Sequence, residues 1–200
     1  MRKVIPFLLL VVLASLGAVT QLQADMLFDL DYLPSADYAN AKDKLDIYMP
    51  PGATESPVVV YFHGGGLMLG DKSLGQVVAK RLLAQGIGMV SANYRLSPGV
   101  AHPAHIKDAA SATAWVHRNI SQYGGDPKQM YVSGHSAGAY LATLLVLDPQ
   151  HLAQHQMTLA DIRGAIPISP FLYVEETARG RPKSVWGEKP QDWRAASVTP

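Results

Sequence analysis

The 200-residue sequence contains no cysteine. Disulfide bonds therefore contribute nothing to its stability, and a lipid anchor on an N-terminal cysteine is excluded. The chain also has no excess of charge of one sign, because 17 lysine and arginine residues are balanced by 16 aspartate and glutamate residues. A near-neutral chain without a basic stripe argues against a nucleic acid partner. Internal repeats and low-complexity tracts are absent too.

A long apolar run is lacking as well. The most apolar stretch, residues 7–16, is short for the ~20 residues of a membrane-spanning helix, which makes an uncleaved anchor the weaker alternative. It follows the basic residues Arg2 and Lys3 and precedes small and polar residues, a layout typical of a secretory signal peptide. We predict a signal peptide over residues 1–24, cleaved after Ala24, with cleavage after Ala18 as the alternative. The remaining protein is expected to be periplasmic or secreted in a bacterium, with no stable membrane span.

The rest of the chain predicts one globular domain over residues 25–200. Its 48% content of hydrophobic residues is sufficient for a substantial core. Apolar, β-branched runs alternate with helix-forming segments. We expect strands at 27–33, 44–49, 58–62, 87–92, 130–133 and 164–169, and helices at 74–85, 104–122 and 139–147. Such alternation predicts an α/β fold, a doubly wound and mostly parallel sheet with its functional site at the carboxyl ends of the strands.

One such strand end carries the sequence Gly134-His135-Ser136-Ala137-Gly138. This sequence is typical of a nucleophile elbow, a sharp turn between a strand and a helix that holds its central serine in a strained conformation and needs small flanking residues. The helix predicted at 139–147 is the elbow helix. The start of the following helix also favours a developing negative charge. We therefore predict Ser136 as a nucleophile; an ordinary tight turn is the alternative.

A second glycine-rich segment, His63-Gly64-Gly65-Gly66, directly follows the predicted strand 58–62. Successive glycines allow backbone amides to turn toward a ligand without an intervening Cβ. Amides arranged in this way can hold the oxyanion of an acyl-transfer intermediate. A flexible loop is the alternative for this segment taken alone.

In this order the segments resemble the carboxylesterase and lipase branch of the α/β-hydrolase superfamily that carries an H-G-G-G motif. The resemblance runs from about Leu45 to the end of the chain, and further segments support it. These are 91–98 (Ser-Ala-Asn-Tyr-Arg-Leu-Ser-Pro), 103–109 (Pro-Ala-His-Ile-Lys-Asp-Ala) and 123–127 (Tyr-Gly-Gly-Asp-Pro). His135 stands where the hormone-sensitive-lipase-like group has aspartate. At this position the sequence resembles instead the feruloyl-esterase-like and arylformamidase-like carboxylesterases.

The resemblance implies a set of site residues. Ser136 is the nucleophile, and the oxyanion donors are the amides of Gly65, Gly66 and Ala137. His63 braces the glycine loop. The remaining motif residues that support the site are Gly64, Gly134, His135 and Gly138. No metal or other cofactor is implied.

The same resemblance implies an acid and then a histidine base after the nucleophile, but no histidine follows His155. We expect His151 and His155 on a solvated helix or loop, too close to the elbow helix to serve as the base. Their i, i+4 spacing lacks the glutamate of a zinc protease. The remaining candidates for the acid after Ser136 are Asp161, Glu175, Glu176, Glu188 and Asp192, and neither the acid nor the base is assigned.

The final residues, 194–200, resemble the family's segment just before the strand that delivers the acid. We therefore expect the chain to be the front portion of a longer enzyme, an α/β-hydrolase domain without its final strands. A reading frame that terminates after Pro200 would contradict this expectation.

The resemblance implies a carboxylic ester hydrolase that forms an acyl-enzyme on Ser136. Its partner is a small-molecule ester, with a short-chain or aryl group. One alternative is an exported pseudo-hydrolase that only binds ligands, and another is a serine amidase, peptidase or acyltransferase. Tyr173, Trp186 and Trp193 are candidate liners of the substrate site, with core packing as the equal alternative.

Overall fold

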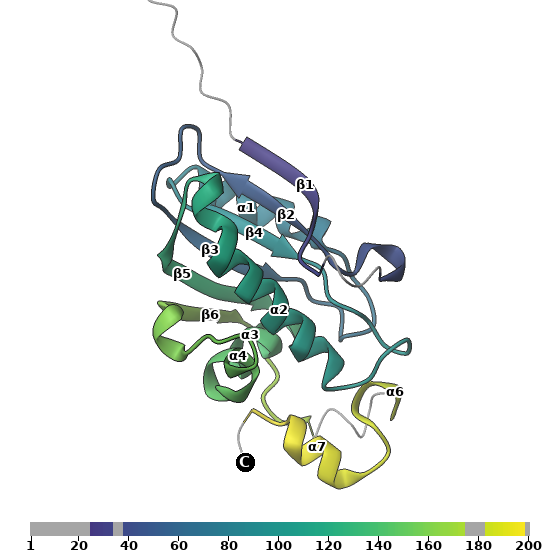
Figure 1. Ribbon diagram of the computed structural model, residues 1–200. Helices are drawn as coiled ribbons and strands as arrows, with labels where there is room; N and C mark the ends of the chain where they lie inside the picture. The colour runs from purple at the N-terminus through teal and green to yellow at the C-terminus, as the bar shows by residue number, and fades with distance from the viewer. Residues whose placement is uncertain (1–24, 34–37, 175–182, 199–200) are drawn as a thin grey trace, which may run out of the picture.

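The computed structural model describes residues 25–33, 38–174 and 183–198. The predicted signal peptide, residues 1–24, lies outside this part of the chain. A single six-stranded sheet forms the centre of the described structure (Figure 1). Its strands are β1 (Asp25–Asp31), β2 (Lys44–Met49), β3 (Ser56–Phe62), β4 (Gly88–Ala92), β5 (Gly125–His135) and β6 (Gly164–Ile168).

The strand order is β1-β2-β4-β3-β5-β6. Strand β3 pairs in parallel with β4 and β5, and β5 pairs in parallel with β6, whereas β1 and β2 run antiparallel to their neighbours. The mostly parallel, doubly wound sheet is therefore confirmed. Its order places β3 beside β5, so the segments that follow these two strands emerge next to each other.

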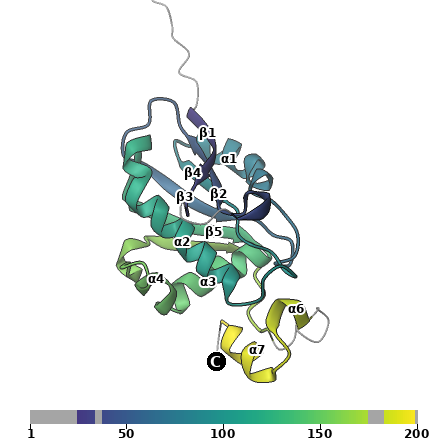
Figure 2. The same cartoon turned by 45° about the vertical axis from the view of Figure 1, so that its right-hand side comes forward.

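Helices cover both faces of the sheet. Helix α1 (Gln76–Leu83) packs on one face, while α2 (Ala104–Asn119) and α3 (Ala137–Leu147) pack on the other and contact each other (Figures 1 and 2). The shorter helices are α4 (Gln150–Ala153), α6 (Lys183–Trp186) and α7 (Pro190–Ala196), with 3₁₀ turns at Ala39–Ala41, Lys72–Gly75, Ile120–Tyr123 and Leu159–Asp161. No helix of the described residues is long and apolar enough to cross a membrane.

The central strand β3 contributes side chains to two hydrophobic clusters, one on each face of the sheet. Val58, Val60 and Phe62 face the α2 and α3 side, and Val59 and Tyr61 face α1. All five side chains are buried, because strand β3 has a neighbour on each side and helices on both faces. Continuous apolar runs are typical of such strands, which is why this strand could be predicted.

The boundaries differ from expectation where tertiary pairing extends an element. The strand predicted at 130–133 is part of the longer β5, whose first residue, Gly125, pairs with Ser56 across an irregular register. The helix predicted at 104–122 changes to 3₁₀ geometry after Asn119 and ends before Gly124, which has φ 84°. The strand predicted at 44–49 is confirmed residue for residue.

The aromatic residues near the C-terminus divide between core and surface. Trp186 is only 1% exposed and packs edge-on against Tyr140 and Phe171, which stack on each other at 4.7 Å. Its position is therefore in the core. Tyr173 is exposed, and the half-buried Trp193 donates its indole N–H to the carbonyl of Gly187 at 3.0 Å.

Candidate active site

Ser136 occupies the junction between β5 and α3. Its backbone has φ 53° and ψ −112°, a conformation that costs a residue other than glycine roughly 1–3 kcal/mol. Two hydrogen bonds hold it: the Ser136 amide donates to Ile168 of β6 at 2.9 Å, and the Ser136 carbonyl accepts from Tyr140 at 3.0 Å. The surrounding sheet and helix thus enforce a strained turn that presents a half-buried serine at the carboxyl end of the sheet.

Close packing explains why the elbow needs glycine on both sides of the serine. A Cβ on Gly134 would lie 2.7 Å from the carbonyl oxygen of Phe62 and overlap the backbone of Gly138. A Cβ on Gly138 would overlap the carbonyl oxygen of Phe62 itself. Strand β3 and helix α3 therefore approach each other more closely than any side chain would allow.

The glycine loop, residues 63–71 after β3, lies directly beside this elbow. Phe62 pairs with Gly134 across the two strands, and a Cβ on Gly64 would lie 3.5 Å from the Cβ of Ser136. Gly65 and Gly66 have φ of 124° and 65°. The carbonyl of Gly65 accepts hydrogen bonds from the amides of Met68 and Leu69 at 3.1 and 3.0 Å, which closes the loop into a turn.

Three backbone amides remain as donors at this junction. Within the described residues, the amides of Gly65 and Gly66 donate no recorded hydrogen bond. Ala137 is the first residue of α3, and the first amides of a helix have no acceptor within it. The structure thus brings the predicted donors Gly65, Gly66 and Ala137 to the same end of the sheet as Ser136, an arrangement that can hold a negatively charged oxygen.

His63 anchors the start of the glycine loop. Its imidazole stacks on Tyr94 at 4.4 Å, and the Tyr94 hydroxyl donates to the His63 carbonyl at 2.8 Å. Burial lowers the pKa of His63 to about 4, so the ring is neutral at pH 7. The Nδ1 atom, 2.7 Å from the Gly64 carbonyl, must then carry the proton and donate it to this acceptor.

Residues 91–97 supply further anchors for the loop, which the sequence did not reveal. The amide of Ser97 donates to the carbonyl of Leu67 at 2.8 Å. The side chain of Asn93 accepts from the amide of Lys72 at 2.7 Å and donates to the Asp71 carboxylate at 3.0 Å. The segment 91–98 was noted as a motif, but these contacts depend on the parallel pairing of β3 with β4, which places the segments that follow the two strands next to each other.

His135 is exposed and lies over the glycine loop rather than over the nucleophile. A Cβ on Gly64 would lie 2.9 Å from Nδ1 of His135. No recorded hydrogen bond joins this imidazole to Ser136 among the described residues. Its position supports a role in shaping the loop, with Gly64 required for close approach.

The recorded contacts of the other histidines are with residues other than Ser136. His102, His105 and His151 each have a buried Nδ1 without a recorded partner in the described residues, and electrostatic coupling links His102 to the other two. His117 lies 3.7 Å from Asp161, and His155 lies 3.4 Å from the Ser111 hydroxyl. None of these contacts involves Ser136.

One histidine expectation was wrong. His151 is only 7% exposed, because α4 packs against α2, rather than solvated as its position after the elbow helix suggested. His155 is partly buried. Burial lowers the pKa of both imidazoles.

Among the described residues, none of the acidic candidates has a recorded hydrogen bond to Ser136. Asp161 accepts from the Thr158 amide at 2.8 Å in a capping box, and Asp192 lies in the first turn of α7. Glu188 is exposed, whereas 175 and 176, both glutamates, lie outside the described residues. We assign no catalytic acid or base. In the described ranges, histidine and acidic side chains form no group of three that could hold a metal ion.

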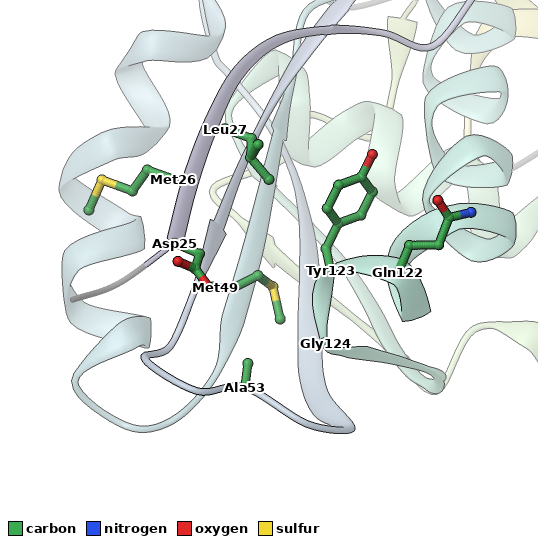
Figure 3. Close-up of a pocket in the computed structure, with 8 residues that line it drawn as sticks. All are labelled: Asp25, Met26, Leu27, Met49, Ala53, Gln122, Tyr123 and Gly124. Atoms are coloured by element: carbon green, nitrogen blue, oxygen red, sulfur yellow. The ribbon is translucent and has the colours of Figure 1, made fainter. Parts of the chain in front are cut away.

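A cavity of about 370 Å³ lies at the opposite end of the sheet (Figure 3). It is lined by Asp25, Met26, Leu27, Met49, Ala53, Gln122, Tyr123 and Gly124. These residues surround the beginnings of β3 and β5, whereas Ser136 follows the end of β5. This cavity therefore does not serve the predicted nucleophile.

Part of the chain is similar in sequence to known proteins. The family model BD-FAE matches residues 45–165. Carboxylesterase NlhH of Mycobacterium tuberculosis is 41% identical over 102 residues, covering 50% of this chain and 32% of the relative. A probable isoprenylcysteine alpha-carbonyl methylesterase of Oryza sativa subsp. japonica is 36% identical over 107 residues, covering 53% and 25%. The chain thus spans about a quarter to a third of these relatives.

Solved esterases share the fold. Esterase B from Lactobacillus rhamnosis superposes with a TM-score of 0.73 at 19% identity, covering 88% of this chain and 60% of the esterase. The Pyrobaculum calidifontis esterase gives a TM-score of 0.62 at 27% identity, covering 76% and 46%. The chain therefore has an α/β-hydrolase fold.

Proposed function

The chain belongs to the BD-FAE family of the α/β-hydrolase fold, and from this membership we propose that it is a serine-dependent carboxylic ester hydrolase. One observation carries the proposal. Ser136 sits on a strained turn directly beside a glycine loop and a helix start whose amides are free to donate. Such an arrangement is suited to nucleophilic attack on a carbonyl and to stabilisation of the resulting oxyanion.

The chemistry follows from these positions. Ser136 Oγ attacks the ester carbonyl carbon and gives up its proton to a general base, while the carbonyl oxygen becomes negative. The amides of Gly65, Gly66 and Ala137 are the proposed donors to this oxygen. Collapse of the intermediate breaks the bond to the alkoxy group, which leaves as the alcohol after protonation. Water then attacks the acyl-enzyme and releases the acid. The base and its orienting acid are not assigned.

We propose short-chain or aryl esters as substrates. Support comes from the resemblance to carboxylesterases and from relatives named as a carboxylesterase and a methylesterase. The same relatives do not favour a binding module without turnover. A panel of short-chain, long-chain and feruloyl esters, formamides and amides tests the substrate class. Turnover of amides alone would overturn it in favour of an amidase.

The test of the reaction class is the hydrolysis of p-nitrophenyl butyrate by the protein expressed from its complete gene. We expect Ser136→Ala to reduce turnover at least about 1,000-fold, since the nucleophile provides the covalent step. The matched control is Ser121→Ala, because Ser121 is exposed in the 3₁₀ turn Ile120–Tyr123. Equal turnover by Ser136→Ala and the parent protein would contradict the proposal.

Export to the periplasm or medium is a separate proposal, supported by the basic start and short apolar stretch before Asp25. Cell fractionation and N-terminal sequencing test it. We expect the exported protein to begin at Asp25. An intact N-terminus in the cytosolic fraction would contradict it.

A further inference from the structure

Lys42 reaches the glycine loop from outside the segment that the family model matches. It lies in the connection between β1 and β2, and its side chain is 14% exposed. Its ammonium donates to the carbonyl oxygen of Gly70 at 3.1 Å and lies 3.7 Å from the Asp71 carboxylate. In the described part of the chain, it is the one side chain with a recorded hydrogen bond to the Gly70 carbonyl.

Gly70 is where the end of the loop meets its beginning. Its φ of 109° is in the region that favours glycine. A Cβ at this position would overlap the imidazole of His63 and the carbonyl of Gly64. The Gly70 backbone therefore packs against the residues that precede Gly65 and Gly66. A contact that fixes the Gly70 carbonyl also limits how far these two residues can shift.

Lys42 is itself held in place. The Tyr32 hydroxyl lies 2.9 Å from the Lys42 carbonyl and 3.1 Å from the Asn93 carbonyl. Asn93 also donates its side-chain amide to the carbonyl of Ala41 at 2.9 Å. Hydrogen bonds thus join the β1–β2 connection to the segment after β4, and Lys42 and Asn93, one from each, both contact Asp71. The ammonium of Lys42 approaches the loop from a fixed backbone.

The Asp71 side chain is an ionised carboxylate at neutral pH. Burial acts to raise its pKa, but hydrogen bonds from Ser73 and Asn93, together with the charge of Lys42, outweigh burial and lower the pKa to about 2. The negative charge at Asp71 is therefore available to attract the Lys42 ammonium at any pH at which an esterase would be assayed. Hydrogen bonds that involve a charged group are stronger than neutral ones.

We propose that Lys42 is a positioning residue for the oxyanion hole. By holding the Gly70 carbonyl and the Asp71 carboxylate, it fixes the glycine loop so that the amides of Gly65 and Gly66 are directed to the oxyanion formed at Ser136. It contacts neither the nucleophile nor the ester. The inference rests on the proposed esterase function, since it assigns a role within that site.

Hydrogen exchange of the loop tests this role without requiring turnover. Lys42→Met keeps a similar length but removes the donor and the charge. We expect the amides of Met68 and Leu69, which donate to the Gly65 carbonyl inside the loop, to exchange about tenfold faster in this variant, with peptides from β3 and α3 unchanged. Lys42→Arg should restore slow exchange. The control Lys80→Met makes the same change of charge at an exposed position of α1 and should have no effect. Unchanged exchange of the loop in Lys42→Met would overturn the proposal.

Ester hydrolysis supplies the second readout in the protein expressed from its complete gene. We expect Lys42→Met to lower kcat about tenfold with KM nearly unchanged, because displaced oxyanion donors affect the transition state rather than ester binding. Faster loop exchange together with an unchanged kcat would overturn the catalytic role of the contact. Absence of hydrolysis in the parent protein would instead refute the proposed function, and the exchange experiment would still decide whether Lys42 holds the loop.

Discussion

Gly138 shows how a single missing side chain sets the geometry of the elbow. Because a Cβ there would overlap the Phe62 carbonyl, Gly138→Ala must push α3 away from β3. We expect the free energy of unfolding to fall by at least about 2 kcal/mol. Urea denaturation checks this. The control is Gly164→Ala, where the nearest atom to the new Cβ is 3.4 Å away in Tyr131. Similar unfolding midpoints for both variants would contradict the packing argument.

Buried neutral histidines make stability depend on pH. Burial lowers the pKa of His63 to about 4 and that of His105 to about 3, where the charges of His102 and Arg95 add to the effect. The unfolded chain, with a histidine pKa near 6.5, therefore binds more protons than the folded protein between these values. The contribution of each neutral histidine to the free energy of unfolding is fully present above pH 6.5. It is lost as the pH falls toward 4 for His63 and toward 3 for His105.

The expected slope is about 1.4 kcal/mol per pH unit for each of the two histidines. Urea denaturation at pH 7.5, 6 and 5 measures it. His105→Gln should reduce the slope, since glutamine can keep a hydrogen bond to the Ser97 hydroxyl without titrating. The same slope in the variant and the parent would show that His105 does not contribute.

Residues differ in how far the sequence alone could place them. Ser136 and its flanking glycines could be predicted because the steric demand of the turn is local and is written in five consecutive residues. Lys42 could not be predicted, because its contact with Gly70 depends on how two distant connections meet. His151 was expected in solvent for the same reason, since its burial comes from the packing of α4 on α2.

At the level of elements, α2 depends on small residues. Four alanines of this helix, Ala109, Ala110, Ala112 and Ala114, are completely buried. We expect Ala110→Leu to lower the free energy of unfolding by about 1–3 kcal/mol, because a larger side chain would separate α2 from its neighbours. Thermal and urea unfolding measure the change. Arg118→Leu, at an exposed position of the same helix, should have little effect, and an equal loss in both would contradict the argument.

Strand β6 forms one edge of the sheet in the described residues, and its apolar side chains are open to solvent. Ile166 is 51% exposed and Ile168 45% exposed. Exposed apolar edges promote association between chains. In the 200-residue chain we expect Ile166→Lys to reduce the concentration dependence of the apparent size in light scattering. Val77→Lys, an exposed position on α1, is the control. No difference between the two variants would argue against association through β6.

Element types were predictable where a run was continuously apolar or strongly amphipathic, as in β3 and α2. Element ends were not, because pairing between distant strands decides them. The first residues of β5 contain Asp126, Pro127 and Lys128, which do not favour a strand, yet the pairing of Gly125 with Ser56 draws this segment into the sheet.

At the scale of the whole molecule, the strand order assembles the candidate site. Gly66 and Ser136 are 70 residues apart in the sequence, and the parallel pairing of β3 with β5 places the segments that follow them side by side. Neither glycine-rich motif contains this information alone. The family resemblance predicted that the glycine loop and Ser136 lie together. The observed topology gives the physical reason, because the helical crossovers of a parallel sheet return each strand with its carboxyl end at the same edge.

We propose Ser136 as the nucleophile of an ester hydrolase. The most direct measurement is labelling with an uncharged fluorophosphonate, followed by mapping of the modified residue by mass spectrometry, in the protein expressed from its complete gene. We expect a single adduct on Ser136 that is lost in Ser136→Ala. An adduct on another serine, or no adduct while esters are still hydrolysed, would contradict it.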